Sequence, residues 1–144
     1  MSHVMTPVVE CINFIRARGL NHRQFRMYFK EVEAEYREML YHTEVRFLSR
    51  GRVLIRFFEL LSAVELFLVE RGKHVPQLSD PEWVADLAFC CDLNVHLNTL
   101  NLRLQGRNIL IIDMSDNIVA FKSKLQVWRN QLGEKDFIQF PHLN

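Results

Sequence analysis

The sequence predicts an all-α fold in which about five helices pack as a bundle. Glycine and proline number only 5 and 4 in 144 residues, which leaves few residues for the many turns of a β-sandwich. Apolar residues recur at spacings of three and four along most of the chain, as they do on one face of a helix. The last two helical segments have heptad-like stripes, which are typical of an antiparallel helical pair.

The first third of the chain is expected to form two amphipathic helices and then an extended segment. A helix over residues 4–17 buries one apolar stripe and stops at Gly19. A second helix over residues 22–40 has aromatic and aliphatic residues on one face and charged residues on the others. Between Tyr41 and Leu48 apolar and polar residues alternate, and this pattern favours extended chain.

The next two helices have well-marked boundaries. Ser49 is a natural N-cap for a third helix that reaches Arg71, and its apolar face is wide enough to be buried on more than one side. Asp80 followed by Pro81 is a strong start signal, because a capping side chain then precedes proline at the first helical position. The fourth helix should run from Pro81 to about Gln105.

A fifth helix over residues 108–132 has the most regular pattern. Its apolar residues alternate at spacings of three and four, as in a coiled coil. We interpret them as an interaction stripe, which consists of Ile111, Met114, Ile118, Phe121, Leu125, Trp128 and Leu132. The tail over residues 137–144 is apolar enough to dock on another surface.

Composition excludes several classes of protein. Lys and Arg total 18 against 17 Asp and Glu, so the whole molecule has no net field that would attract nucleic acid or a membrane surface. The three cysteines, Cys11, Cys90 and Cys91, fit neither a disulfide framework nor a zinc motif, which favours a reducing compartment. No secretory signal or membrane span is recognisable, so we expect an intracellular protein without membrane partners.

Local positive charge is concentrated around the start of the third helix. The candidate nucleic-acid-binding residues there are Arg46, Phe47, Arg50, Arg52 and Arg56. Free backbone N–H groups and the helix dipole also favour anions at a helix start, so several donors could hold a phosphate while the aromatic ring stacks on a base. The alternative is that Arg46 pairs with a carboxylate and Phe47 belongs to the core.

No group of residues has the pattern of a catalytic or metal site. Cys90 and Cys91 diverge by about 100° on a helix, and a fourth ligand to accompany His96 is missing. Asp113 and Asp116 share a helix face that we interpret as solvated. Phosphate-binding loops, serine elbows and reactive-cysteine signatures are absent from the sequence, so no catalytic residue, metal, cofactor or small-molecule substrate is predicted.

Four ordered blocks of the sequence resemble a segment of hAT-superfamily transposases. They are NFIRARGLNHRQF at residues 13–25, YHTEVRFLSRGR at 41–52, PQLSDPEWVADLAF at 76–89 and HLNTLNLRLQG at 96–106. The chain is most similar to vertebrate proteins derived from these transposases. These include the BED zinc-finger transposase-like proteins and the transposase-like half of proteins that carry general transcription factor II-I repeats.

The resemblance implies a position within the family's catalytic region, where an all-helical insertion interrupts a ribonuclease-H-like fold. It implies a single partial domain over residues 1–144, with a flanking region at 1–48, an insertion-like region at 49–136 and a tail at 137–144. The family's three catalytic acids lie outside the matched part, so the chain should not cut or join DNA. In the block Thr43–Gly51, Arg46 matches the family's motif and Phe47 stands where tryptophan is usual.

The sequence therefore predicts a non-catalytic, domesticated or truncated hAT-transposase-like protein of the nucleus, with DNA as a partner through its arginine-rich helix start. The alternative is a helical module without DNA binding that dimerises or binds another protein through the interaction stripe and the tail.

Overall fold

The computed structural model describes residues 1–17, 46–105 and 110–144, with residues 46–50 described by their backbone alone. The described residues form five α-helices and one short 3-10 helix, and they contain no strand. The helices are α1 (Ser2–Ala17), α3 (Arg46–Glu59), α4 (Leu61–Glu70), η1 (Pro76–Ser79), α5 (Pro81–Leu104) and α6 (Ile111–Gly133). The all-α prediction is confirmed.

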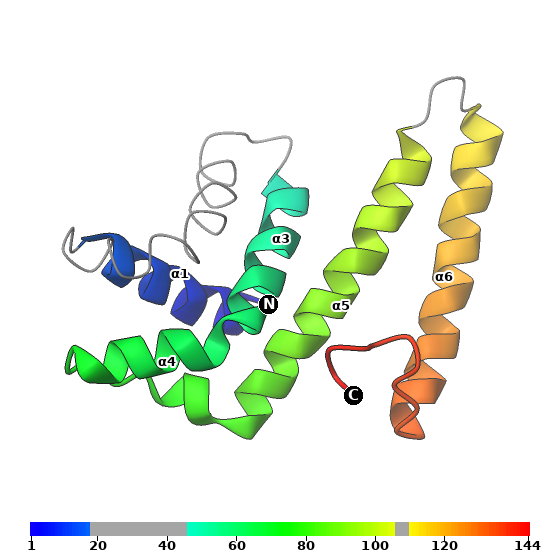
Figure 1. Ribbon diagram of the computed structural model, residues 1–144. Coiled ribbons are helices and arrows are strands. Elements are labelled where there is room, and N and C mark those ends of the chain that lie inside the picture. The colour runs from blue at the N-terminus through cyan, green and yellow to red at the C-terminus, as the bar shows by residue number, and fades with distance from the viewer. Residues whose placement is uncertain (18–45, 106–109) are drawn as a thin grey trace.

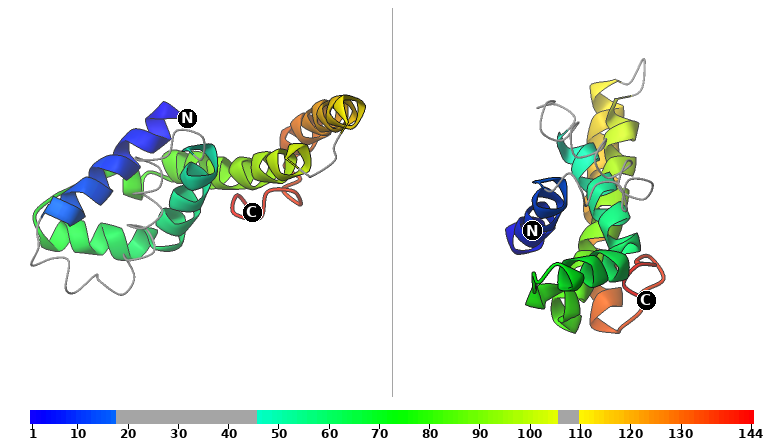
Figure 2. Two further views of the ribbon diagram at one scale, coloured as in Figure 1. Left: turned by 90° about the horizontal axis from the view of Figure 1, so that it is seen from above. Right: turned by 60° about the vertical axis from the view of Figure 1, so that its left-hand side comes forward.

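Helix α5 is the central element of the molecule. It contacts α1, α3, η1 and α6, and its contact with α3 is the most extensive. Figure 1 shows α1, α3 and α4 on one side of α5 and the antiparallel helix α6 on the other. Seen from above, α1 and α6 lie on opposite sides of α5 (Figure 2). The predicted antiparallel pair is therefore formed by α5 and α6.

The core lies among α1, α3, α4 and the first half of α5. Helix α1 contributes the apolar stripe that its spacing predicted, which consists of Val4, Val8, Cys11, Ile12 and Ile15. The other helices add buried side chains that include Val53, Phe57, Val64, Phe67, Trp83 and Leu87. Since α6 supplies no residue to this cluster, its apolar side chains must be covered elsewhere or remain exposed.

The predicted third helix is wrong in its length, because the chain bends at Leu60. The amide N of Leu60 donates to the carbonyl oxygens of both Arg56 and Phe57, each at 3.2 Å, and a new helix then begins at Leu61. The bend turns α4 away from the direction of α3 (Figure 1), so that Phe57 from one helix and Val64 from the other reach the same core. The wide apolar face is thus buried by two short helices.

The predicted start of this helix is also wrong. Helix α3 already includes Arg46, so Ser49 lies inside the helix and residues 46–48 are helical rather than extended. A short alternating run does not by itself separate a strand from a buried helix segment. The predicted second helix over residues 22–40 and the remainder of the predicted extended segment lie outside the described residues.

Gly51 sets the distance between α3 and α5. It is buried inside α3, where glycine costs about 0.5–1 kcal/mol of helix stability relative to alanine. A Cβ atom added to Gly51 would lie 2.9 Å from the Cβ atom of Asn94 on α5. The absent side chain therefore lets the two helices approach closely.

The predicted start of α5 is confirmed. A carboxylate oxygen of Asp80 accepts a hydrogen bond of 3.0 Å from the amide N of Glu82, and Pro81 occupies the first turn. The preceding α4 ends at Glu70, and Gly72, two residues later, has a φ of 70°, which suits glycine. These local signals fix where the long central helix begins.

Candidate interaction surface

The contact between α5 and α6 is centred on Trp128. Its indole is 5% exposed and stacks on the ring of His96, with the ring centroids 4.2 Å apart. Phe121, two turns earlier on α6, meets the Trp128 ring edge-on at 5.7 Å. Two of the seven residues of the predicted interaction stripe are therefore occupied within the chain, because Phe121 and Trp128 face α5.

Four other residues of the predicted stripe are exposed. Ile111 is 84% exposed, Ile118 43% and Leu125 42%, and Met114 is also exposed. Residues seven apart lie on the same side of a helix, so Ile111, Ile118 and Leu125 form a continuous apolar row along α6. We call these three residues the exposed α6 stripe; Met114 lies on the side of Phe121 and Trp128, seven residues before Phe121. Burying such a row would remove apolar area from water, which favours association at about 25 cal/mol per Å².

Further exposed apolar residues at α6 were not predicted. Leu110, which is the N-cap, and Ile112, Val119 and Val127 are also exposed, but they do not form one row, since Leu110 and Val119 lie on opposite sides of the helix. The sequence does contain a sign of these residues. Apolar residues occur as neighbouring pairs, such as Ile111–Ile112 and Ile118–Val119, and one heptad pattern accounts for only one member of each pair. Monomeric proteins rarely expose so many large apolar residues on one helix.

Positive charge flanks the exposed α6 stripe. Lys122 and Arg129 follow Ile118 and Leu125 by four residues, and this spacing places them on the same side of α6. Both side chains are exposed, and neither forms an ion pair with any residue of the described ranges. The stripe is therefore apolar along its length and basic toward the C-terminal half of α6.

The tail docks on α5 and α6 of its own chain, where Figure 1 shows it beside both helices. Phe140 is 1% exposed and stacks on Phe89 at 5.5 Å, with its edge toward Trp128 at 5.8 Å. The buried carboxylate of Asp92 accepts hydrogen bonds from the backbone N–H groups of His142 and Leu143 at 3.0 and 3.3 Å.

The same carboxylate also pairs with the imidazole of His142, whose Nδ1 lies 2.5 Å from Asp92 Oδ1. A buried carboxylate is costly unless it is paired and hydrogen-bonded, and the tail supplies all of these partners. Asp92 is therefore a tail anchor, and sequence spacing could not identify it, because its partner lies 50 residues away.

The arginine-rich segment lies along α3. Arg46, Phe47 and Arg50 fall where the structure describes only the backbone, so the prediction for their side chains lies outside the described residues. Arg52 is exposed, whereas Arg56 is half-buried and its Nη1 lies 2.9 Å from Glu59 Oε2. Because α3 includes Arg46, Arg50 and Arg52 lie in its second turn, beyond the first-turn N–H groups expected to bind an anion.

Comparison with known proteins identifies the family of the chain. The sequence profile of the FAM200/GTF2IRD2 helical domain matches residues 1–133, which include all five described α-helices. The chain belongs to the FAM200/GTF2IRD2-like family. No solved structure matches it significantly.

Two relatives of this FAM200/GTF2IRD2-like chain show the same relationship. General transcription factor II-I repeat domain-containing protein 2 of Bos taurus is 46% identical over 143 residues, and the protein of the same name from Mus musculus has the same identity over the same length. The alignment covers 99% of this chain and 15% of each relative. The predicted relationship to proteins with general transcription factor II-I repeats is confirmed.

The cysteines of this family member are buried free thiols. Burial raises the pKa of Cys11 to about 11, although nearby Lys73 opposes the rise. Burial, with help from the Asp92 carboxylate, raises the pKa of Cys91 to about 12, and burial also raises the pKa of Cys90. Thiols with such pKa values are protonated at neutral pH and are poor nucleophiles or metal ligands.

These raised pKa values predict a loss of stability in alkaline solution. Below pH 9.0, which is the ordinary pKa of this thiol, Cys11 is protonated in both the folded and the unfolded chain. Above pH 9.0 the unfolded chain loses the proton, whereas the folded chain keeps it until the pH approaches the raised pKa of about 11. The free energy of unfolding should therefore fall by up to about 1.4 kcal/mol per pH unit for each such thiol. Urea unfolding at several pH values between these two should show that the free energy of unfolding falls less steeply with pH in Cys11→Ala than in the unsubstituted chain. The same pH dependence in both would contradict a raised pKa for Cys11.

The described part of the chain contains neither a candidate metal site nor a helix suited to cross a membrane. Within residues 1–17, 46–105 and 110–144, no three His, Cys, Asp or Glu side chains are grouped to hold a metal ion. Likewise, no helix in these ranges combines the length and the apolar character that a membrane span requires.

Proposed function

We propose that this chain is a non-catalytic protein-association module, which binds the helix of a partner protein along the exposed α6 stripe. The observation that carries the proposal is the exposure of Ile111, Ile118 and Leu125 in one row on α6, beside the row of Phe121 and Trp128 that packs on α5. A helix lying in an apolar groove or on an apolar face is a recurrent mode of recognition.

The partner helix is an apolar helix flanked by acidic residues. Lys122 and Arg129 border the exposed α6 stripe, and complementary charge on a partner would favour correct binding and speed its association. In a symmetric pair of copies, neither α6 would offer an acidic residue to these two cations, because Asp113 and Asp116 lie on other sides of the helix from Ile118. Charge therefore favours a different protein over a second copy of this chain.

The names of the relatives support a nuclear role linked to transcription. Both relatives are described as general transcription factor II-I repeat domain-containing proteins, and the chain covers 15% of their length. In this proposal the module belongs to a domesticated, non-catalytic derivative of an hAT-type transposase, with residues 49–136 as the insertion-like region.

The test is titration of the chain with two synthetic helical peptides that share one row of leucines. One peptide carries glutamates beside the leucines and the other carries lysines. We expect the glutamate peptide to bind at least about tenfold more tightly, because it pairs with Lys122 and Arg129. Fluorescence anisotropy of labelled peptides at low and high salt measures both affinities.

Two variants locate the binding. Ile118→Glu should abolish peptide binding, because it places a negative charge in the apolar row. Ser123→Glu makes the same charge change about 140° around the same helix and should leave the affinity within about twofold. Equal loss in both variants, or equal binding of the two peptides, would refute association through this row.

DNA contact through α3 is a second candidate function, supported by the exposed Arg52 within the basic segment Arg46–Arg56. The candidate residues are Arg46, Phe47, Arg50, Arg52 and Arg56. Each lost phosphate contact should reduce, by about one, the steepness with which the logarithm of DNA affinity falls with the logarithm of salt concentration. Replacing both Arg50 and Arg52 by alanine should therefore reduce this slope by about two. An unchanged slope in titrations of duplex DNA would exclude these residues.

A further inference from the structure

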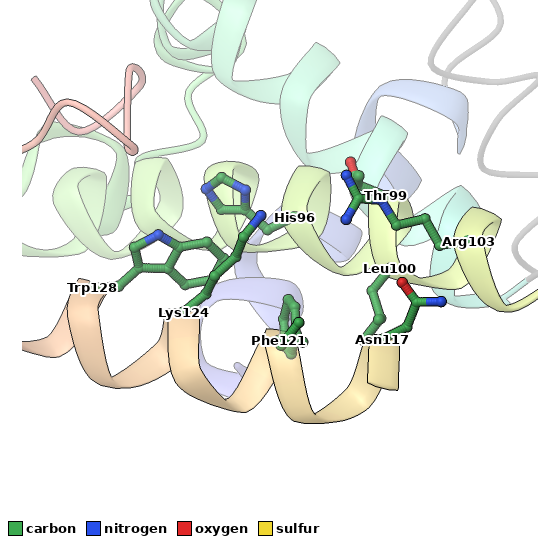
Figure 3. A pocket seen from close by; sticks show the side chains of 9 residues that line it. His96, Thr99, Leu100, Arg103, Asn117, Phe121, Lys124 and Trp128 are labelled. Atoms are coloured by element: carbon green, nitrogen blue, oxygen red, sulfur yellow. The ribbon is translucent and has the colours of Figure 1, made fainter. Parts of the chain in front are cut away.

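The seam between α5 and α6 continues beyond the docked tail as a small open groove. Thr99 and Arg103 line it from α5, Asn117 and Lys124 line it from α6, and the rings of Phe121 and Trp128 form an apolar wall. Figure 3 shows these side chains between the two helices. His96 closes one end, where its Nε2 lies 2.8 Å from the carbonyl oxygen of Gln139 in the tail.

The groove is positively charged. Figure 3 shows Arg103 and Lys124 extending from opposite helices along the same rim of the groove. None of the residues that line it is acidic, and neither cation forms an ion pair with a residue in the described ranges. Two cations with no counter-ion in the described part of the chain attract an anion.

The neutral polar groups of the groove are partly occupied within their own helices. The Thr99 hydroxyl donates to the carbonyl oxygen of Val95 at 3.0 Å, and the Asn117 amide donates to the carbonyl oxygen of Asp113 at 2.8 Å. The principal donors left for a ligand are therefore the guanidinium of Arg103 and the ammonium of Lys124.

The groove has room for a small anion. Its cavity volume is about 40 Å³, and it is open to solvent on one side. One water requires roughly 10–15 Å³ measured in this way, so the cavity holds about three heavy atoms, which is the size of a carboxylate. Arginine binds a carboxylate through two parallel hydrogen bonds, and the apolar wall suits the methylene groups that carry an acidic side chain's carboxylate.

We propose that this groove is a carboxylate site, in which Arg103 and Lys124 hold the side chain of an acidic residue from a peptide segment. The apolar wall of Phe121 and Trp128 packs against the methylene groups of that side chain. The site is independent of the exposed α6 stripe, because Lys124 lies about 120° around α6 from Ile118.

The probe is a blocked glycine–glutamate–glycine tripeptide, and the readout is the NMR signal of the Arg103 Nε–H in the full 144-residue chain. We expect this signal to shift and to saturate with a dissociation constant in the low millimolar range, about 1 mM. The Nε–H of Arg71 is an internal reference, because its guanidinium lies 5.2 Å over the ring of Phe67 in α4, and neither residue lines the groove. Its signal should remain unchanged.

Two variants that each remove one positive charge, and two further ligands, complete the test. Lys124→Gln should weaken tripeptide binding about tenfold, whereas Lys122→Gln, on a different side of α6, should leave it unchanged. A glutamine tripeptide should not shift the signal. The proposal is overturned if the Arg103 signal stays fixed, if the glutamine tripeptide acts equally, or if inorganic phosphate binds more tightly than the glutamate tripeptide.

Discussion

Replacing Gly51 with leucine is expected to destabilise the chain by about 3 kcal/mol or more, because the new side chain has no room between α3 and α5. Even a bare Cβ atom would lie 2.9 Å from the Cβ atom of Asn94. That neighbour is buried and bound to its own helix through a hydrogen bond of 2.7 Å from its amide to the carbonyl oxygen of Cys90. The helices themselves must therefore separate.

Urea unfolding followed by circular dichroism measures this loss. The matched control is Gly133→Leu at the end of α6, where an added Cβ atom meets nothing within 4 Å. The control should change the free energy of unfolding by no more than about 0.5 kcal/mol. A Gly51→Leu variant as stable as the control would show that α3 and α5 are not held together at this crossing.

Replacing Phe140 with alanine is expected to cost about 3 kcal/mol and to release the tail from α5 and α6. The ring is fully buried and contacts Phe89, His96 and Trp128. Ile138→Ala in the same tail is the matched control, because Ile138 is exposed and its loss should change stability by about 0.5 kcal/mol or less.

A double mutant separates tail docking from simple loss of apolar burial. Asp92→Asn alone should cost about 2 kcal/mol, because it removes the charge that holds the His142 imidazole and two tail N–H groups. If the tail docks as one unit through Phe140 and through the partners of Asp92, Asp92→Asn should cost much less than about 2 kcal/mol when Phe140 is already alanine. Fully additive losses in urea unfolding would contradict a tail that docks as a unit.

Local signals in the sequence predicted the elements whose boundaries depend on neighbouring residues. The start of α5 follows from Asp80 and Pro81, and the apolar spacing of α1 and α6 follows from helix geometry. The break at Leu60 could not be predicted, because no proline or glycine marks it. It arises from packing two apolar faces into one core, and such tertiary effects override local pattern.

The candidate sites were only partly predictable for a related reason. The heptad pattern identified the apolar residues of α6, but it could not tell which face α5 covers, so Trp128 and Ile118 looked equivalent. The Asp92 anchor and the groove between Arg103 and Lys124 join residues far apart in the chain. Only the folded arrangement of α5, α6 and the tail brings them together.

The central claim is that a partner helix binds α6 along Ile111, Ile118 and Leu125. Methyl NMR of the chain titrated with the glutamate-flanked leucine peptide tests it most directly. The account predicts that the methyl signals of Ile118 and Leu125 shift and saturate together, while those of Val119 and Val127 on other sides of α6 stay in place. Shifts centred on Val119 and Val127, or no saturable shift in any α6 methyl group, would contradict it.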